Sequence, residues 1–135
     1  MATHSTSDMT WNPWQPAPYA DAEGAPMLMH GIVSNHYRGG IEAEGSQHVL
    51  IALGPDGTST FTGLERVTGR VGDREGTFVL RISGSTAGGK ANAELTVVEG
   101  SGTGALAGIS GQGEYFCDNP GPNGNAAVTL DHSFG

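Results

Sequence analysis

Two titratable residues, Glu65 and His48, have the side chains in this sequence best suited to acid and base chemistry. Glu65 stands in an alternating run that places Phe61 and Val67 on the same face. An acid on an otherwise apolar face is costly to bury unless it is paired or protonated, and burial raises its pKa toward neutrality. Such a carboxyl can serve as a general acid or base. The alternative is a structural carboxyl whose hydrogen bonds are satisfied by its neighbours.

His48 is placed beside Glu65 by the hairpin turns that the sequence predicts. A turn at 54–57 sets His48 opposite Gly63, diagonal to Glu65 on the inner face. A carboxylate next to an imidazole holds the ring in one tautomer, so the two residues would form an acid/base couple. A shift of one residue in the register would turn His48 outward, and the alternative is then a surface histidine.

The remaining chemistry-bearing residues favour a ligand pocket over a metal centre. His30, His36 and His132 lack the spacing of metal ligands, and the glycine-rich run 100–104 lacks the ending of a phosphate-binding loop. Neither a metal nor a cofactor is therefore expected. Bulky aromatic and apolar residues suit a pocket for a hydrophobic small molecule, and they suit a plain core equally. The predicted ligand contacts are Trp14, Met29, Tyr37, Leu50, Phe61, Phe78, Leu80, Leu95, Tyr115 and His132.

Composition limits both the fold and the partners. The chain has 135 residues, of which 23 are glycine, and it shows no sustained helical period, which favours an all-β fold with many turns. A formal net charge of -8 argues against binding nucleic acid or an anionic membrane surface. The single cysteine, Cys117, excludes an internal disulfide. With neither a secretory signal nor a membrane-spanning run in the sequence, a cytoplasmic location is expected.

The elements that must position these side chains are short alternating runs separated by turn sequences. The central hairpin, 58–84, is predicted to turn at 71–74, which sets Glu65 opposite Leu80. A second hairpin, 26–53, turns at two glycines, and its predicted register places Met29 opposite Leu50. The eight expected strands cover 9–15, 26–37, 41–53, 58–70, 77–83, 91–99, 111–117 and 126–134.

Eight short strands joined by tight turns predict an all-β, antiparallel up-and-down barrel with a central cavity, because closure leaves no unpaired strand edge. A β-sandwich is the alternative. Residues 1–8 are polar and are expected to form a flexible N-terminal tail, so that 9–135 make a single barrel domain.

The stretch GLERVTGRVGDREGTFVLRISG, followed by VVEGSGTGALAGISGQGEY, resembles the bacterial domain-of-unknown-function 3224 family. The resemblance extends over nearly the whole chain, from Trp14 and Pro18 to the last strand, which ends at Phe134. It implies an eight-stranded antiparallel barrel of the allene oxide cyclase-like, or calycin-like, kind around a cavity, often in a homo-oligomer. The family has no common assigned activity, although relatives by fold include cofactor-free cyclases.

The function expected from these observations is that of a cofactor-independent cyclase or isomerase. Its substrate would be a polyketide- or fatty-acid-like intermediate held in the barrel lumen. The barrel would orient this molecule and exclude water, while Glu65 and His48 move protons. The alternatives are a non-catalytic carrier of a hydrophobic small molecule and a solid barrel with a structural role.

Overall fold

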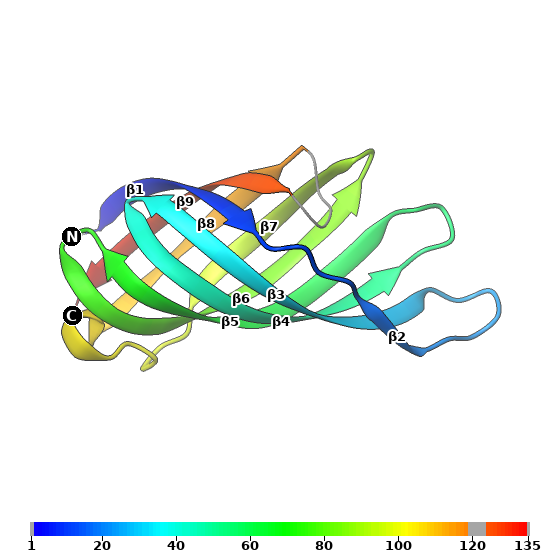
Figure 1. Ribbon diagram of the computed structural model, residues 1–135, viewed down its shortest axis with the longest axis horizontal. Coiled ribbons are helices and arrows are strands. Elements are labelled where there is room, and N and C mark those ends of the chain that lie inside the picture. The colour runs from blue at the N-terminus through cyan, green and yellow to red at the C-terminus, as the bar shows by residue number, and fades with distance from the viewer. Residues whose placement is uncertain (1, 119–123, 135) are drawn as a thin grey trace.

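The chain forms a closed antiparallel β-barrel (Figure 1). The computed structural model describes residues 2–118 and 124–134, and these contain nine strands and one short 3-10 helix. Eight strands close into a ring because β1 pairs with both β9 and β3, whereas β2 lies outside the ring against β3. The predicted all-β barrel is confirmed. The bounds are β1 Thr3–Trp11, β2 Ala17–Ala20, β3 Met27–Gly39, β4 Ile41–Leu53, β5 Ser59–Val71, β6 Arg74–Ala87, β7 Lys90–Val97, η1 Gly104–Leu106, β8 Ile109–Cys117 and β9 Asn125–Phe134.

The central hairpin, β5–β6, has the register that the sequence predicts. Glu65 pairs with Leu80, and Val71 pairs with Arg74 across a two-residue turn. The first turn residue, Gly72, has a φ of 61°, a left-handed conformation that glycine adopts without steric cost. Alternation along the two arms then directs Glu65 and Leu80 into the barrel, where each has at most 1% of its surface exposed.

Strand β4 lies one residue out of the predicted register. His48 pairs with Ile32 on β3 and with Leu64 on β5, rather than with the glycines expected opposite it. Because successive side chains of a strand point to opposite faces, this shift turns His48 and Leu50 to the outer wall. The prediction that these two residues face the lumen is therefore wrong.

The shift arises in the loops at the two ends of β4, which hold an odd number of residues. Leu53 pairs with Ser59, so the loop between β4 and β5 has five residues where the sequence predicts a two-residue turn. The Gly54 N–H donates to the carbonyl of Thr58 at 2.8 Å and closes that loop. The pairing between β3 and β4 is likewise centred on one residue, Gly40. Each loop moves β4 by one position against its neighbour.

The N-terminal residues close the barrel, so the predicted tail at 1–8 is wrong for the residues that lie in β1. Thr3 pairs with His132 on β9, and Trp11 pairs with Asn35 on β3. Their polar sequence suggests a free tail, yet backbone pairing to two neighbours needs no apolar side chains. The segment expected as a loop at 16–25 also contains a strand, β2, paired with β3.

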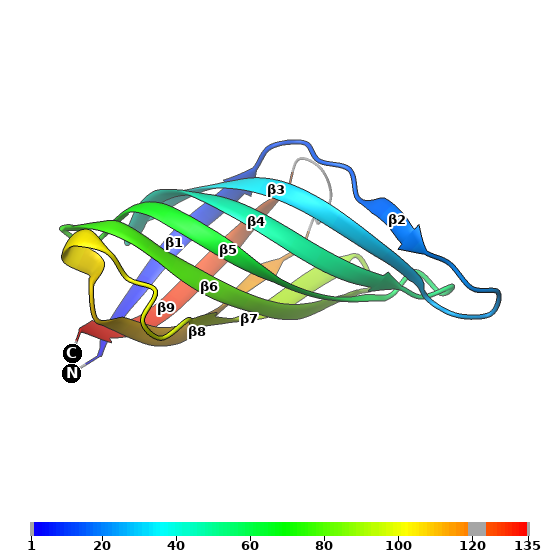
Figure 2. The same cartoon turned by 90° about the horizontal axis from the view of Figure 1, so that it is seen from below.

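One end of the barrel is plugged by η1, which lies near both chain termini (Figure 2). Its Leu106 is fully buried and extends the apolar core at that end. The segment before η1 is fixed by Thr103, whose Oγ1 lies 2.7 Å from the Oγ1 of Thr77. No helix among the described residues has the length and apolarity needed to cross a membrane.

Candidate functional site

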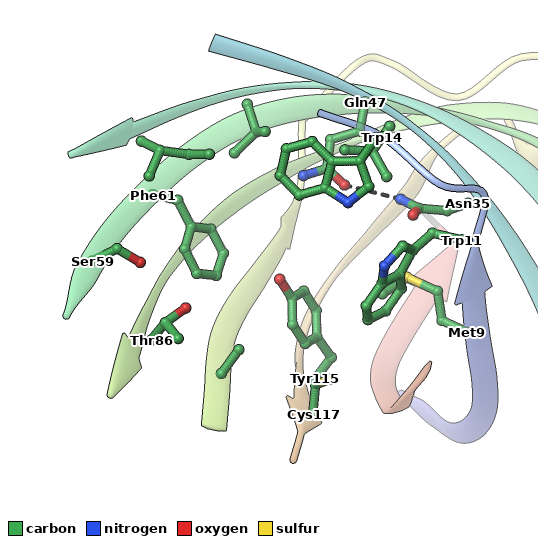
Figure 3. Close-up of a pocket in the computed structure, with 14 residues that line it drawn as sticks. Met9, Trp11, Trp14, Asn35, Gln47, Ser59, Phe61, Thr86, Tyr115 and Cys117 are labelled. Atoms are coloured by element: carbon green, nitrogen blue, oxygen red, sulfur yellow. Dashed lines mark hydrogen bonds between the residues drawn. The ribbon is translucent and has the colours of Figure 1, made fainter. Parts of the chain in front are cut away.

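The end of the barrel away from η1 holds a pocket with a volume of about 170 Å³ (Figure 3). The side chains around it come from seven of the eight ring strands and from the segment between β1 and β2, and they are mostly aromatic and aliphatic. They are Met9, Trp11, Trp14, Val33, Asn35, Gln47, Val49, Ile51, Ser59, Phe61, Thr86, Ala91, Tyr115 and Cys117.

Trp14 is held over the pocket by the connection between β1 and β2. Its half-buried ring lies against Gly31, where an added Cβ would overlap the ring. Glycine at that position therefore provides the space for the indole. Phe61 and Tyr115 approach from the opposite wall, and the Tyr115 hydroxyl points into the hollow (Figure 3). Together with Trp11, these residues surround one space with four aromatic side chains.

The floor of the pocket carries a pair of amide side chains. Asn35 on β3 donates from Nδ2 to the Oε1 of Gln47 on β4 at 2.9 Å, and both residues are buried. Among the described residues that line the pocket, none is charged. The site therefore combines apolar walls with a neutral polar floor, an arrangement that fixes the orientation of a bound small molecule.

Glu65 lies beside this floor, because it pairs with Gln47 across β4 and β5, and it has 1% of its surface exposed. The Tyr37 hydroxyl donates to its Oε2 at 2.6 Å. Gly45 faces the carboxyl from β4, and a Cβ there would overlap Oε2, so glycine makes room for the acid. The predicted inward orientation of Glu65 is confirmed, although Glu65 does not itself line the pocket.

The electrostatics of Glu65 are dominated by burial. Loss of hydration raises the pKa of its carboxyl from 4.5 to about 7, and hydrogen bonds from Tyr37 and Asn35 oppose this increase. Burial, with the Glu65 charge as a lesser cause, also raises the pKa of Tyr37 and of Tyr115. Near neutral pH, Glu65 therefore changes protonation while the two phenols stay neutral.

The predicted couple of Glu65 and His48 does not form. Glu65 is inside the barrel and His48 is on its outer wall, so the wall itself separates them. The structure instead surrounds Glu65 with Tyr37 and Asn35. His48 contacts another histidine, His30, at 3.2 Å.

The ten predicted ligand contacts are divided among the pocket, the core and the outer wall. Trp14, Phe61 and Tyr115 line the pocket. Leu50 is on the outer wall with 48% of its surface exposed, and Met29 is half-buried without lining the pocket. Tyr37, Phe78, Leu80, Leu95 and His132 are buried outside the pocket lining.

His132 differs from the other residues of that buried group because it can carry a charge. It lies toward the plugged end, where its ring packs edge-on against Phe134 at 5.8 Å between centroids. Burial lowers the pKa of the His132 imidazole. Its predicted place beside the ligand is therefore not supported by the position of the pocket.

The polar floor was not predicted, because the assumed register of β4 turned Gln47 outward. The sequence nevertheless carries the signal. The odd-numbered positions of β4 include Ile41, Val49 and Ile51, whereas the even-numbered ones include Glu42 and Glu44. The more apolar set faces inward in a half-buried strand, and Gln47 belongs to that set.

The profile of a family described as "Protein of unknown function (DUF3224)" matches residues 5–131. The chain belongs to the DUF3224 family. The barrel of this DUF3224 chain is similar to the crystal structure of a DUF3224 protein of unknown function from Shewanella oneidensis MR-1, with a TM-score of 0.80 and 24% sequence identity. The similarity covers 100% of this chain and 99% of the other, and it concerns the fold. No curated protein matches the DUF3224 chain.

Proposed function

We propose that the protein binds a small, uncharged and largely apolar molecule at the open end of the barrel. The observation that carries this proposal is the convergence of Trp14, Phe61 and Tyr115 on one hollow above the amide pair of Asn35 and Gln47. Aromatic walls take up apolar surface, and a few fixed polar groups give specificity.

Volume and charge narrow the class of ligand. An engineered protein cavity of about 150 Å³ takes up benzene, and the pocket here has about 170 Å³. It therefore suits one small aromatic ring system or a short chain, and the remainder of any longer molecule would lie outside the mouth. A charged group would lose its hydration without gaining a partner, because the described lining residues are neutral.

Binding of simple probes tests this proposal. Indole and naphthalene are titrated into the protein by calorimetry, with benzoate as the charged comparison. We expect the neutral probes to bind and benzoate to bind at least about tenfold more weakly. Phe61→Ala removes one wall and should lower indole affinity by about tenfold, since a lost aromatic contact is worth on the order of 1.5 kcal/mol.

Phe116→Ala is the matched control, because Phe116 neighbours Tyr115 on β8 and points outward with 44% of its surface exposed. It should leave indole affinity unchanged. If wild-type protein binds neither neutral probe, or if Phe116→Ala loses as much affinity as Phe61→Ala, the pocket is not a ligand site.

A second candidate function is a cofactor-independent isomerisation or cyclisation of the bound molecule. It is favoured by one observation: the Glu65 carboxyl, whose pKa is about 7, lies beside the pocket floor and accepts a hydrogen bond from Asn35. A general acid or base works best when its pKa is near the working pH. With a substrate found by screening, Glu65→Gln should abolish turnover and retain binding. Equal turnover in the variant would exclude Glu65 as the acid or base, and recovery of every bound molecule unchanged from the wild type would leave only the carrier role.

A further inference from the structure

Two histidines meet on the outer wall of the barrel, outside the ligand pocket. His30 on β3 pairs with Leu50, and His48 on β4 pairs with Ile32, so the two imidazoles are diagonal neighbours on one face. The Nε2 of His30 lies 3.2 Å from the Nδ1 of His48, and the ring centroids are 5.2 Å apart. Both strands are long and paired on both sides, so the backbone holds the rings close together.

We infer that His30 and His48 chelate one divalent transition-metal ion, with water in the remaining positions. Nitrogens 3.2 Å apart that each bind a metal at about 2.0–2.1 Å subtend an angle of about 100° at the metal. That angle lies between about 90° for an octahedral site and about 109° for a tetrahedral one. One ion can therefore bridge the two nitrogens in place of the proton between them, once each ring turns its lone pair off the line that joins them.

The chemistry of the pair selects the class of metal. Imidazole nitrogens suit Cu²⁺, Ni²⁺ and Zn²⁺, whereas Mg²⁺ and Ca²⁺ prefer oxygen ligands. Among the described residues, no group of three or more His, Cys, Asp or Glu is placed to hold a metal, so this site has two protein ligands and moderate affinity. The formal net charge of -8 favours the approach of a cation.

Apolar side chains surround the pair. Ile32, Leu50 and Leu64 have 56%, 48% and 54% of their surfaces exposed on the same face of β3, β4 and β5. Hydrophobic side chains around a metal site control the access of solvent and the local dielectric constant. The pair arises only from the true register of β4, because the predicted register puts His48 inside the barrel and His30 outside it.

Metal titration of the untagged protein, freed of metal with a chelator, tests the inference. We expect calorimetry with Ni²⁺ to give one ion per chain. His30→Ala and His48→Ala should each lower the affinity at least about tenfold. His36→Ala is the matched control: His36 is on the same strand, with its Nδ1 3.6 Å from Glu44, and its removal should leave the affinity unchanged.

Two further measurements of metal binding remain valid even if the histidine variants are less stable than the wild type. The Cu²⁺ form of the wild-type protein should give an electron paramagnetic resonance spectrum with two imidazole nitrogens. Ni²⁺ should raise the wild-type melting temperature and leave unchanged that of a double variant that carries both His30→Ala and His48→Ala. A spectrum with fewer than two nitrogens, or equal Ni²⁺ affinity in the wild type and the double variant, would overturn the inference.

Discussion

Glu65 shows how one buried acid sets the pH dependence of the whole fold. The carboxyl pKa is about 7 in the folded chain and 4.5 when hydration is restored, so folding takes up a proton between these pH values. The folded state binds more protons there, and stability falls as the pH rises from about 4.5 to about 7. Below pH 4.5 the carboxyl is protonated in the folded and the unfolded state, so its ionisation costs no stability. Above pH 7 it is ionised in both states, and the loss of unfolding free energy is complete.

Glu65→Gln should remove this dependence, because the amide cannot ionise. Relative to the variant, we expect the wild type to lose on the order of 3 kcal/mol of unfolding free energy between pH 4.5 and pH 7.5. Urea unfolding at a series of pH values measures the difference. His132, with its lowered pKa, acts in the opposite direction in both proteins, so its effect cancels. Glu44→Gln, an exposed acid, is the control, and parallel curves for the wild type and Glu65→Gln would contradict the argument.

At the scale of elements, η1 closes one end of the barrel while the pocket occupies the other. Leu106 is completely buried in the plug, so Leu106→Ala should leave a cavity and cost about 2–5 kcal/mol of stability. Indole affinity at the far end should change less than twofold. Thermal unfolding and the same calorimetric titration measure the two effects. Ala105→Ser, at an exposed position of η1, should change neither; a Leu106→Ala variant as stable as wild type would exclude the plug role.

The strands also show which parts of the fold the sequence could predict. The register of β5–β6 followed from a two-residue turn built around Gly72, whose chemistry allows one geometry. The sequence after Leu53 is compatible with loops of more than one length. The two-residue turn predicted there, in place of the five-residue loop, exchanges the inward and outward faces of β4. Together with the turn assumed at Gly39 and Gly40, it places His48 inward and Gln47 outward, so the predicted catalytic couple is wrong while the predicted barrel is right. The composition of the two faces of β4 was a better guide than its turns.

For the whole molecule, closure depends on a strand that the sequence does not mark as apolar. The part of β1 before Trp11 alternates between buried and exposed residues, with Ser7 and Met9 buried. The backbone of β1 pairs with β9 from Thr3 to Thr10 and with β3 from Ser7 to Trp11, and the Gly40 N–H donates to the carbonyl of Thr6. The Ser7 Oγ adds a side-chain bond by accepting from the Ile41 N–H at 2.9 Å. Backbone pairing therefore explains the strand, and pairing of that kind is weakly encoded in side-chain polarity.

Removal of residues 2–8 should consequently open the barrel instead of trimming a tail. Strand β9 would lose its partners from Thr3 to Asp8, and β3 would lose its partners Ser7 and Asp8. The strand edges left unpaired promote association between chains. We expect the truncated protein to lose its cooperative thermal transition and to elute as aggregates in size-exclusion chromatography. The double variant Thr6→Ala and Asp8→Ala changes two exposed side chains of β1 and keeps its backbone, so it should elute and melt like the wild type. A truncated protein that melts cooperatively at the wild-type temperature would mean that β1 contributes nothing to closure.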